Sequence, residues 1–283
     1  MIPGSLRRGI LVLALLLAAP AFAKEAVDVE LVLAIDISGS IDPDEARMQR
    51  EGYVAALTDR RVLGAITSGI HGKIAIAYVE WASSYQRNTL LDWTVIDGAG
   101  SAGATAAKLA AIPINIGQRT SISTAIDYSM QMLGKSPFEG IRRVIDISGD
   151  GPNNDGGLVT TARDRALDAG VIINGLPIIN GKPNRFGFPT MQDLDRYYEG
   201  CVIGGPGSFV VKADSFEAFA DAVKQKLILE IAGLTPPRTQ YAALDGPPLD
   251  SVGQLAQQKP EYHLGCDIGE RQSRDYFRQR WER

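Results

Sequence analysis

Strand-like and helix-like stretches alternate along this chain, and that alternation restricts its fold more than any other feature. Apolar runs at residues 27–37 and 171–179 are separated by stretches whose apolar residues recur at helical spacing. This pattern is typical of a mostly parallel sheet with helices on both faces. Residues 73–82 and 85–96 are joined by a very short turn, which predicts an antiparallel hairpin. We therefore expect an α/β fold, Rossmann-like and doubly wound, with one antiparallel edge strand.

Capping signals and periodicity place the remaining elements. Asp42 and Glu45 have the spacing of a capping box around Pro43, so a helix is predicted from there to about residue 63. The same spacing at Asp214 and Glu217 predicts a last helix that ends near residue 233. Further strands are expected at residues 143–148 and 209–212, and further helices at 158–169 and around the apolar stripe Ile122, Ala125, Ile126, Met130 and Leu133.

The N-terminus has the pattern of a signal peptide. Arg7 and Arg8 precede an apolar run at residues 10–19, and small residues surround a cleavage point after Ala23. The run is shorter than the roughly 20 residues that a membrane-spanning helix needs, so a retained anchor is the less favoured alternative. We expect residues 1–23 to be removed, which leaves a periplasmic or secreted chain without a transmembrane segment.

The composition and periodicity of the chain change after residue 233. Residues 24–233 carry the alternating pattern, whereas residues 234–283 contain proline pairs and no sustained period, so we expect an extended or partly helical C-terminal tail. Residues 270–283 hold five arginines and three acids. They fit a docking helix or a contact with an anionic surface, or else a tail that folds back on its own domain or stays disordered.

Charge and cysteine content narrow the function. The formal net charge of -4 has no basic bias, so nucleic acid is not an expected partner. Cys201 and Cys266 are the two cysteines of the chain. In an oxidising compartment they can form one disulfide, although two free thiols remain an alternative.

The strongest local signal is the segment Asp36-Ile37-Ser38-Gly39-Ser40, where the first strand meets the first helix. A carboxylate and two hydroxyls spaced two apart can converge on one hard cation. The competing interpretation is a turn that only caps the helix. Thr120 precedes the Ile122 helix and Asp150 follows the strand at 143–148, so all three segments can meet at the carboxyl edge of the sheet.

These segments resemble the metal-ion-dependent adhesion site of von Willebrand factor A domains. In that family an Asp-x-Ser-x-Ser motif, a Thr before a major helix and an Asp after the fourth strand hold one cation. The resemblance covers residues 27–233 and implies that Asp36, Ser38, Ser40, Thr120 and Asp150 are the metal ligands. The chain is most similar to a bacterial secreted family catalogued as domain of unknown function 1194, through softer cues such as Val79-Glu80-Trp81 and Gly204-Gly205-Pro206-Gly207.

The ligand chemistry indicates the cation and the partner. Oxygen-only ligands favour Mg²⁺, with Mn²⁺ or Ca²⁺ as alternatives, over zinc or copper. Two carboxylates balance the charge of the dication, so a partner's Asp or Glu is not repelled and can complete the coordination. The leading hypothesis is therefore a non-enzymatic, cation-dependent protein-binding module.

Two other classes of function stay open. A metal-dependent hydrolase or phosphotransferase of the haloacid dehalogenase type also has an Asp after its first strand, but it needs a second Asp where this chain has Ser38. A structural envelope protein with a vestigial site is the other alternative.

Several other polar and aromatic residues are expected to have structural roles or to lie in no recognisable site. Residues 153–156 are expected to form a surface turn rather than a second cation loop, and Asp146 is expected to be a structural acid. Trp81 and Trp93, both in the hairpin, are expected to have packing roles rather than to stack on a ligand. His71 and His263 lie in no spacing typical of a catalytic triad or a metal site.

Overall fold

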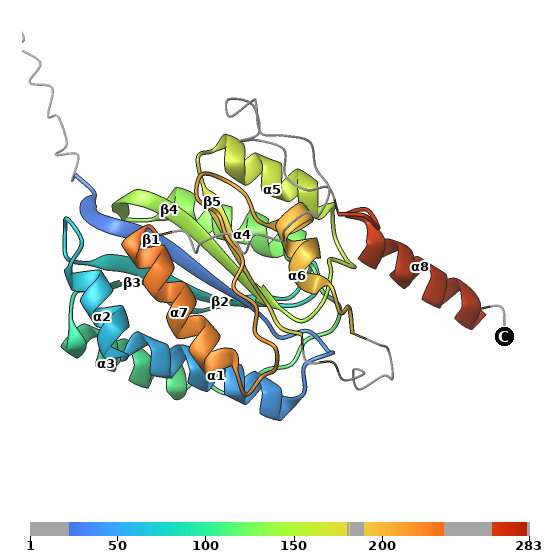
Figure 1. Ribbon diagram of the computed structural model, residues 1–283, viewed down its shortest axis with the longest axis horizontal. Coiled ribbons are helices and arrows are strands. Elements are labelled where there is room, and N and C mark those ends of the chain that lie inside the picture. The colour runs from blue at the N-terminus through green and yellow to red at the C-terminus, as the bar shows by residue number, and fades with distance from the viewer. Residues whose placement is uncertain (1–22, 180, 182–189, 235–261, 282–283) are drawn as a thin grey trace, which may run out of the picture.

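The computed structural model describes residues 23–179, 181, 190–234 and 262–281. A five-stranded sheet lies at the centre of the molecule in the order β3-β2-β1-β4-β5, with helices on both faces (Figure 1). Strand β1 pairs in parallel with β2 and β4, β4 pairs in parallel with β5, and β3 is the antiparallel edge strand. The predicted fold class and the predicted hairpin are therefore confirmed. The strands are β1 (Glu25–Asp36), β2 (Ile74–Trp81), β3 (Arg87–Ile96), β4 (Phe138–Gly149) and β5 (Ile172–Pro177).

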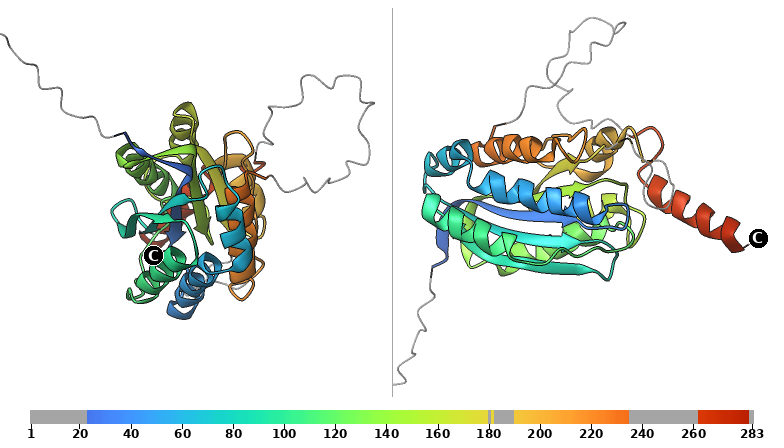
Figure 2. Two further views of the ribbon diagram at one scale, coloured as in Figure 1. Left: turned by 90° about the vertical axis from the view of Figure 1, so that its left-hand side faces the viewer. Right: turned by 90° about the horizontal axis from the view of Figure 1, so that it is seen from below.

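Helices cover both faces of the sheet (Figure 2). They bury alternate side chains of its strands in two apolar cores. On β1, Leu31 and Leu33 belong to one apolar core, whereas Val32 and Ala34 belong to the other. This alternation is what a strand with a period of two produces when both of its faces are covered. The first core is covered by α1 (Pro43–Leu57), α2 (Arg60–Thr67), α3 (Ala99–Ala110) and α7 (Phe219–Ala232), and the second by α4 (Ile122–Lys135), α5 (Val159–Asp168), α6 (Leu194–Tyr197) and the π-helix η1 (Tyr198–Val202).

The start of α1 forms as predicted, but its end does not. The Asp42 side chain accepts hydrogen bonds from the Asp44 and Glu45 amides, and Glu45 bonds back to the Asp42 amide. The single helix expected to reach residue 63 is instead two helices, because the Asp59 side chain accepts a hydrogen bond from the Arg61 amide and caps a new one. Asp59 therefore acts as a helix start inside a continuous apolar pattern.

Two other predictions for the later part of the chain were wrong. Residues 209–212 do not form a strand; they lie beside β5, where Val210 makes an isolated bridge with Gly175. Asp214 and Glu217 do not form a capping box, since α7 begins only at Phe219 with Ala218 as its cap. The predicted end of that helix is confirmed, because Gly233 closes it in a left-handed conformation with φ of 66°.

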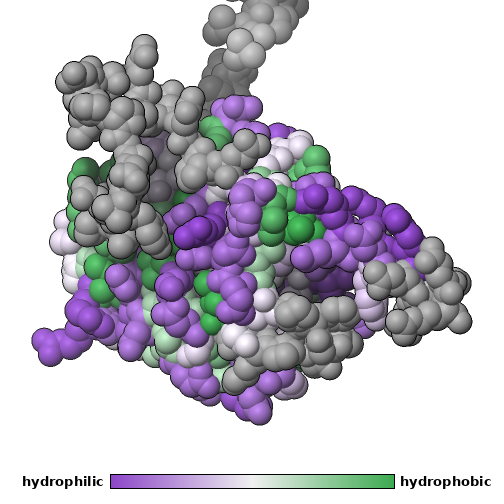
Figure 3. Space-filling view, turned by 45° about the vertical axis from the view of Figure 1, so that its right-hand side comes forward, coloured by the Kyte–Doolittle hydropathy of each residue, from purple (hydrophilic) through white to green (hydrophobic). Residues whose placement is uncertain are grey.

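The C-terminal segment returns to the domain before it projects outward. Tyr262 is buried in the second core, and Cys266 and Ile268 pack against that core. Helix α8 (Ile268–Trp281) then extends away from the body (Figures 1 and 2). Hydrophilic residues predominate on the part of the surface that carries it (Figure 3). None of the helices in the described ranges is long and apolar enough to cross a membrane.

Candidate metal centre

The five predicted ligands meet at the carboxyl edge of the sheet. Asp36 is the last residue of β1, the central strand, and Ser38 and Ser40 follow it in the loop that enters α1. Asp150 follows β4, the neighbour of β1, and Thr120 lies two residues before α4. The parallel pairing of β1 with β4 explains the convergence, because the loops after parallel strands open at the same edge.

A chain of hydrogen bonds joins the two segments that carry the carboxylates. The Ser38 amide donates to Asp36 Oδ1 over 2.7 Å, and the hydroxyls of Ser38 and Ser40 lie 3.1 Å apart. Ser40 Oγ donates to Asp150 Oδ1 over 2.7 Å. Asp36, Ser38, Ser40 and Asp150 therefore form one connected polar group.

Thr120 is fixed beside this group by the loop after β4. Its amide donates to Asn154 Oδ1 over 2.9 Å, and the Asn154 amide donates to the Thr120 carbonyl over 2.8 Å. A Cβ on Gly151, the residue after Asp150, would lie 3.9 Å from Thr120 Oγ1. The Thr120 hydroxyl therefore faces the Asp150 loop.

Both carboxylates of the predicted site are buried. Asp36 is fully buried and Asp150 is 3% exposed. Desolvation, followed by the charge of Asp150, raises the pKa of Asp36 well above its usual range. Desolvation is also the main cause that raises the pKa of Asp150, to about 6. Burial of two acids so close together is unfavourable unless a cation or protons balance their charge.

The donor set fits a hard divalent cation. Asp36 Oδ2 and Asp150 Oδ2 are buried and have no hydrogen-bond partner among the described residues. Three hydroxyls accompany them, and no third acidic, His or Cys side chain joins them in the described ranges. Oxygen ligands of this kind suit Mg²⁺, Mn²⁺ or Ca²⁺, which the two carboxylates and some of the hydroxyls would hold.

Tyr198 is a residue of this site that the sequence did not reveal. A Cβ on Gly149 would lie 2.8 Å from Asp36 Oδ2 and 3.0 Å from the Tyr198 hydroxyl, so Gly149 lets both approach the strand end. The hydroxyl is buried without a hydrogen-bond partner among the described residues. Burial and the charge of Asp36 raise the pKa of Tyr198, which keeps it neutral. Tyr198 lies in η1, far along the chain from every motif, and no spacing signal marks it.

The loop at residues 153–156 also differs from its prediction. Asn153 is fully buried and not part of a surface turn. Its Oδ1 accepts a hydrogen bond from the Ser123 amide over 2.9 Å, in the first turn of α4. Asp155 accepts one from the Ser84 amide over 2.8 Å. These amide and carboxylate groups satisfy backbone donors, so the loop organises its surroundings as polar caps do.

Arg119 carries backbone strain directly beside a predicted ligand. Its φ of 61° is the only left-handed value at a non-glycine residue among the described positions. Its guanidinium lies 3.5 Å from Asp155. Strained conformations of this kind persist where the surrounding structure imposes them, often at functional sites.

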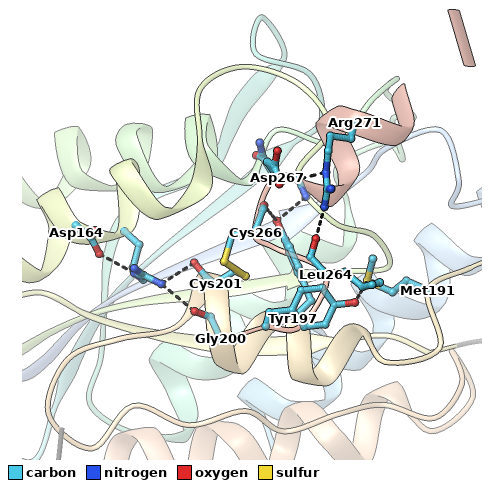
Figure 4. Close-up of a disulfide and its surroundings, with 12 residues drawn as sticks. Asp164, Met191, Tyr197, Gly200, Cys201, Leu264, Cys266, Asp267 and Arg271 are labelled. Atoms are coloured by element: carbon cyan, nitrogen blue, oxygen red, sulfur yellow. Dashed lines mark hydrogen bonds and ion pairs between the residues drawn. A yellow bond between two sulfur atoms is a disulfide. The ribbon is translucent and has the colours of Figure 1, made fainter. Parts of the chain in front are cut away.

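The two cysteines are joined across the chain (Figure 4). Cys201 lies in η1 and Cys266 lies just before α8, with their Cα atoms 5.5 Å apart. Beside them Tyr197 Oη donates to the Cys266 carbonyl over 3.4 Å. The disulfide thus ties the C-terminal segment to the helical layer that carries Tyr198.

The remaining residues of interest lie outside the metal centre. Asp146 is buried and pairs with Lys226 at 2.6 Å, so it is a structural acid as expected. The His71 amide bonds to Asp28 near the start of β1, at the opposite end from Asp36, and His263 lies 3.9 Å from Asp193. Trp81 is buried in the core, and Trp93 donates to the Met132 carbonyl, which confirms packing roles for both tryptophans.

Solved structures show a similar fold at low sequence identity. Proximal thread matrix protein 1 from the mussel byssus has a TM-score of 0.54 at 14% identity, over 74% of this chain and 49% of that one. The same protein with a zinc-occupied MIDAS motif has a TM-score of 0.51 at 16% identity, over 74% of this chain and 47% of that one. The pilus adhesin SpaC from Lactobacillus rhamnosus GG has a TM-score of 0.52 at 14% identity, over 74% of this chain and 31% of that one. The chain thus spans about half or less of these proteins.

The family comparison is more direct. No curated protein matches the chain. The model of the family described as "Protein of unknown function (DUF1194)" matches residues 26–235, which include every element from β1 to α7. The protein therefore belongs to the DUF1194 family, and its fold is of the von Willebrand factor A type.

Proposed function

We propose that this protein is a divalent-cation-dependent protein-binding module. The observation that carries the proposal is the pair of buried carboxylate oxygens, Asp36 Oδ2 and Asp150 Oδ2, which have no hydrogen-bond partner among the described residues. They lie in one polar group with Ser38 and Ser40, and Thr120 faces it. Buried acids without partners are costly, and a bound dication offsets that cost.

The cation is Mg²⁺ in this proposal, with Mn²⁺ or Ca²⁺ as substitutes. All five side chains offer oxygen, which these hard ions prefer. The zinc in the MIDAS motif of the mussel protein belongs to that protein, although it supports a site for a divalent ion in this fold.

The partner is a protein that supplies an Asp or Glu side chain to the cation. Two carboxylates balance the two charges of the ion, so a third carboxylate meets no net repulsion. The similarity to a pilus adhesin supports a role in protein contact, and the acidic balance of the chain does not favour nucleic acid.

Export to the periplasm or the cell exterior belongs to the same proposal. Residues 1–22 of the predicted signal peptide lie outside the described residues. Cleavage after Ala23 would leave Lys24 directly before β1, so every described strand and helix would remain in the mature chain. The disulfide supports an oxidising compartment.

The enzyme alternative lacks support from the residues at the site. Ser38 stands where a phosphotransferase of the haloacid dehalogenase type needs its second Asp, and its hydroxyl is bonded to Ser40. A vestigial site in a structural protein would not require the buried, unpartnered oxygens to persist.

Capture of partners from an envelope extract tests the proposal. The bait is the mature chain with Mg²⁺ or with chelator, beside Asp36→Asn and the control Asp28→Asn. Asp28 is a buried carboxylate on the same strand, but it bonds the His71 and Lys73 amides at the opposite end. We expect a partner that the wild type and Asp28→Asn retain and that chelator or Asp36→Asn releases. Retention of that partner by Asp36→Asn in Mg²⁺, or by the wild type in chelator, would contradict the proposal.

A further inference from the structure

Asn153 connects the C-terminal segment to the predicted metal centre. Asn153 is fully buried, and each of its side-chain polar atoms has a partner. Its Oδ1 accepts from the Ser123 amide, and its Nδ2 donates to the Gly157 carbonyl and, over 2.8 Å, to Glu270 Oε1. One side chain thus joins the first turn of α4, the loop after β4 and the first turn of α8.

The neighbouring residue holds the metal ligand itself. Asn154 exchanges two hydrogen bonds with Thr120, through its side chain to the Thr120 amide and through its own amide to the Thr120 carbonyl. Because Asn153 and Asn154 are adjacent, a contact that fixes the backbone at Asn153 also fixes the position of Thr120.

The C-terminal segment contacts Asn153 by three routes. Glu270 accepts the hydrogen bond described above. Gly269 packs so closely that a Cβ there would lie 2.1 Å from the Asn153 carbonyl oxygen. The Tyr197 hydroxyl accepts from the Asn153 amide over 3.1 Å and donates to the Cys266 carbonyl.

The disulfide makes these contacts persistent. Cys266 is bonded to Cys201, and the peptide carbonyl of Cys266 lies against Tyr197 (Figure 4). The cross-link holds residues 262–270 at η1 even if the rest of α8 moves, because it restricts the separation of the two segments.

We propose that residues 262–270 are a brace for the metal centre, in which Glu270 and Asn153 are positioning residues that hold Thr120 in place. This segment lies outside residues 26–235, the range that the family model matches. The proposal rests on the proposed cation site, but the hold of residues 262–270 on Thr120 can be tested in the protein without cation. Groups that orient ligands from outside the coordination shell commonly set metal affinity.

Four substitutions separate the effect of the brace on the metal centre from its effect on general stability. Glu270→Ala removes the oxygen that accepts the hydrogen bond from Asn153 Nδ2. Glu270→Gln puts an amide oxygen in its place, which can still accept that bond. Gly269→Ala forces α8 away from the Asn153 carbonyl while both cysteines remain. Gly64→Ala is the control, since a Cβ at Gly64 on α2 would meet no atom within 4 Å.

The first measurement is calorimetric titration of the full mature chain with Mg²⁺ and Mn²⁺. We expect the Kd to rise about tenfold in Glu270→Ala and Gly269→Ala, the lower end of the loss typical of outer-shell partners. Glu270→Gln and Gly64→Ala should keep the Kd of the wild type. Unchanged affinity in both disruptive variants overturns the brace.

The second measurement needs no cation. The Thr120 and Ser123 amides donate to the side chains of Asn154 and Asn153, so their hydrogen–deuterium exchange reports the brace directly. Exchange at both amides should be faster in Glu270→Ala than in Glu270→Gln, and equal rates overturn the brace. If the wild type binds no cation, the proposed function fails, and this comparison still decides whether residues 262–270 hold Thr120.

Discussion

Ser40 Oγ donates a 2.7 Å hydrogen bond to Asp150 Oδ1 and so links two loops that lie 110 positions apart in the chain. A hydroxyl that donates one hydrogen bond still offers its lone pairs to a cation. The bond therefore holds both ligands in place without using up the Ser40 oxygen. The other oxygen of that carboxylate, Asp150 Oδ2, has no hydrogen-bond partner among the described residues.

Asp36→Asn should abolish cation binding and leave the fold intact. The substitution keeps the shape of the side chain, so it opens no cavity at this buried position, and it removes a charge that burial disfavours. In calorimetric titration with Mg²⁺ and Mn²⁺ we expect heat of binding for the wild type and none for the variant. The melting temperature of the wild type should rise with cation, because ligand binding stabilises the folded state. Cation binding by the variant with wild-type affinity would exclude the proposed site.

The Cys201–Cys266 disulfide should be present in the purified exported protein. The geometry places the cysteines in bonding contact, and the bond closes a loop with a sequence separation of 65. Alkylation of unreduced, denatured protein should find no free thiol. Replacement of both cysteines by Ser should lower the free energy of unfolding by about 2–4 kcal/mol. Detection of two free thiols in the untreated protein would refute the bond.

Lys226→Met should destabilise the fold strongly. The Lys226 ammonium is buried between two carboxylates, Asp146 at 2.6 Å and Glu230 one helical turn away. Removal of one partner from a buried ionic group leaves uncompensated charge, which costs about 3–5 kcal/mol. Lys212→Met, which breaks the exposed pair of Lys212 with Asp214, should cost less than about 1 kcal/mol. Denaturant unfolding measures both, and similar losses would contradict the assigned burial.

Asp146→Asn should change how stability depends on pH. Desolvation and the Glu230 charge, opposed by Lys226, raise the pKa of Asp146 to about 7, against about 3.9 in an unfolded chain. The folded state therefore binds more protons between these values, and this group makes stability fall as the pH rises from about 4 to about 7. The free energy of unfolding of Asp146→Asn relative to the wild type should increase over that range. A constant difference would show that Asp146 does not titrate there.

Much of the sheet and the predicted ligands follow from the sequence because they depend on local patterns. The period of β1 and the turn between β2 and β3 are visible in consecutive residues, and strand ends fix the edge where Asp36 and Asp150 meet. The sequence does not reveal the break at Asp59, because the apolar pattern continues through it.

The residues that surround the site could not be predicted from the sequence, for a different reason. Tyr198 approaches Gly149 only because η1 packs on the sheet, and Glu270 meets Asn153 only because the C-terminal segment returns to the domain. These contacts join residues that are remote in the chain and carry no spacing signal. The turn-forming neighbours of Asn153 predict a surface turn, although its side chain is buried.

The purified protein should bind its partner through the cation and turn over no substrate. Metal-assisted hydrolysis needs a base or nucleophile beside the activated water. The chain has two histidines, and the structure places the backbone amide of His71 against Asp28 near the start of β1 and His263 beside Asp193. Both cysteines are in the disulfide, and Asp36 and Asp150 are assigned to the cation. Assays with phosphate ester and peptide substrates in Mg²⁺ or Mn²⁺ should therefore give the same background for the wild type and Asp150→Asn. Cation binding, measured in the same preparations, should be lost only in the variant. Turnover by the wild type that disappears in Asp150→Asn would instead make the protein a metal-dependent enzyme.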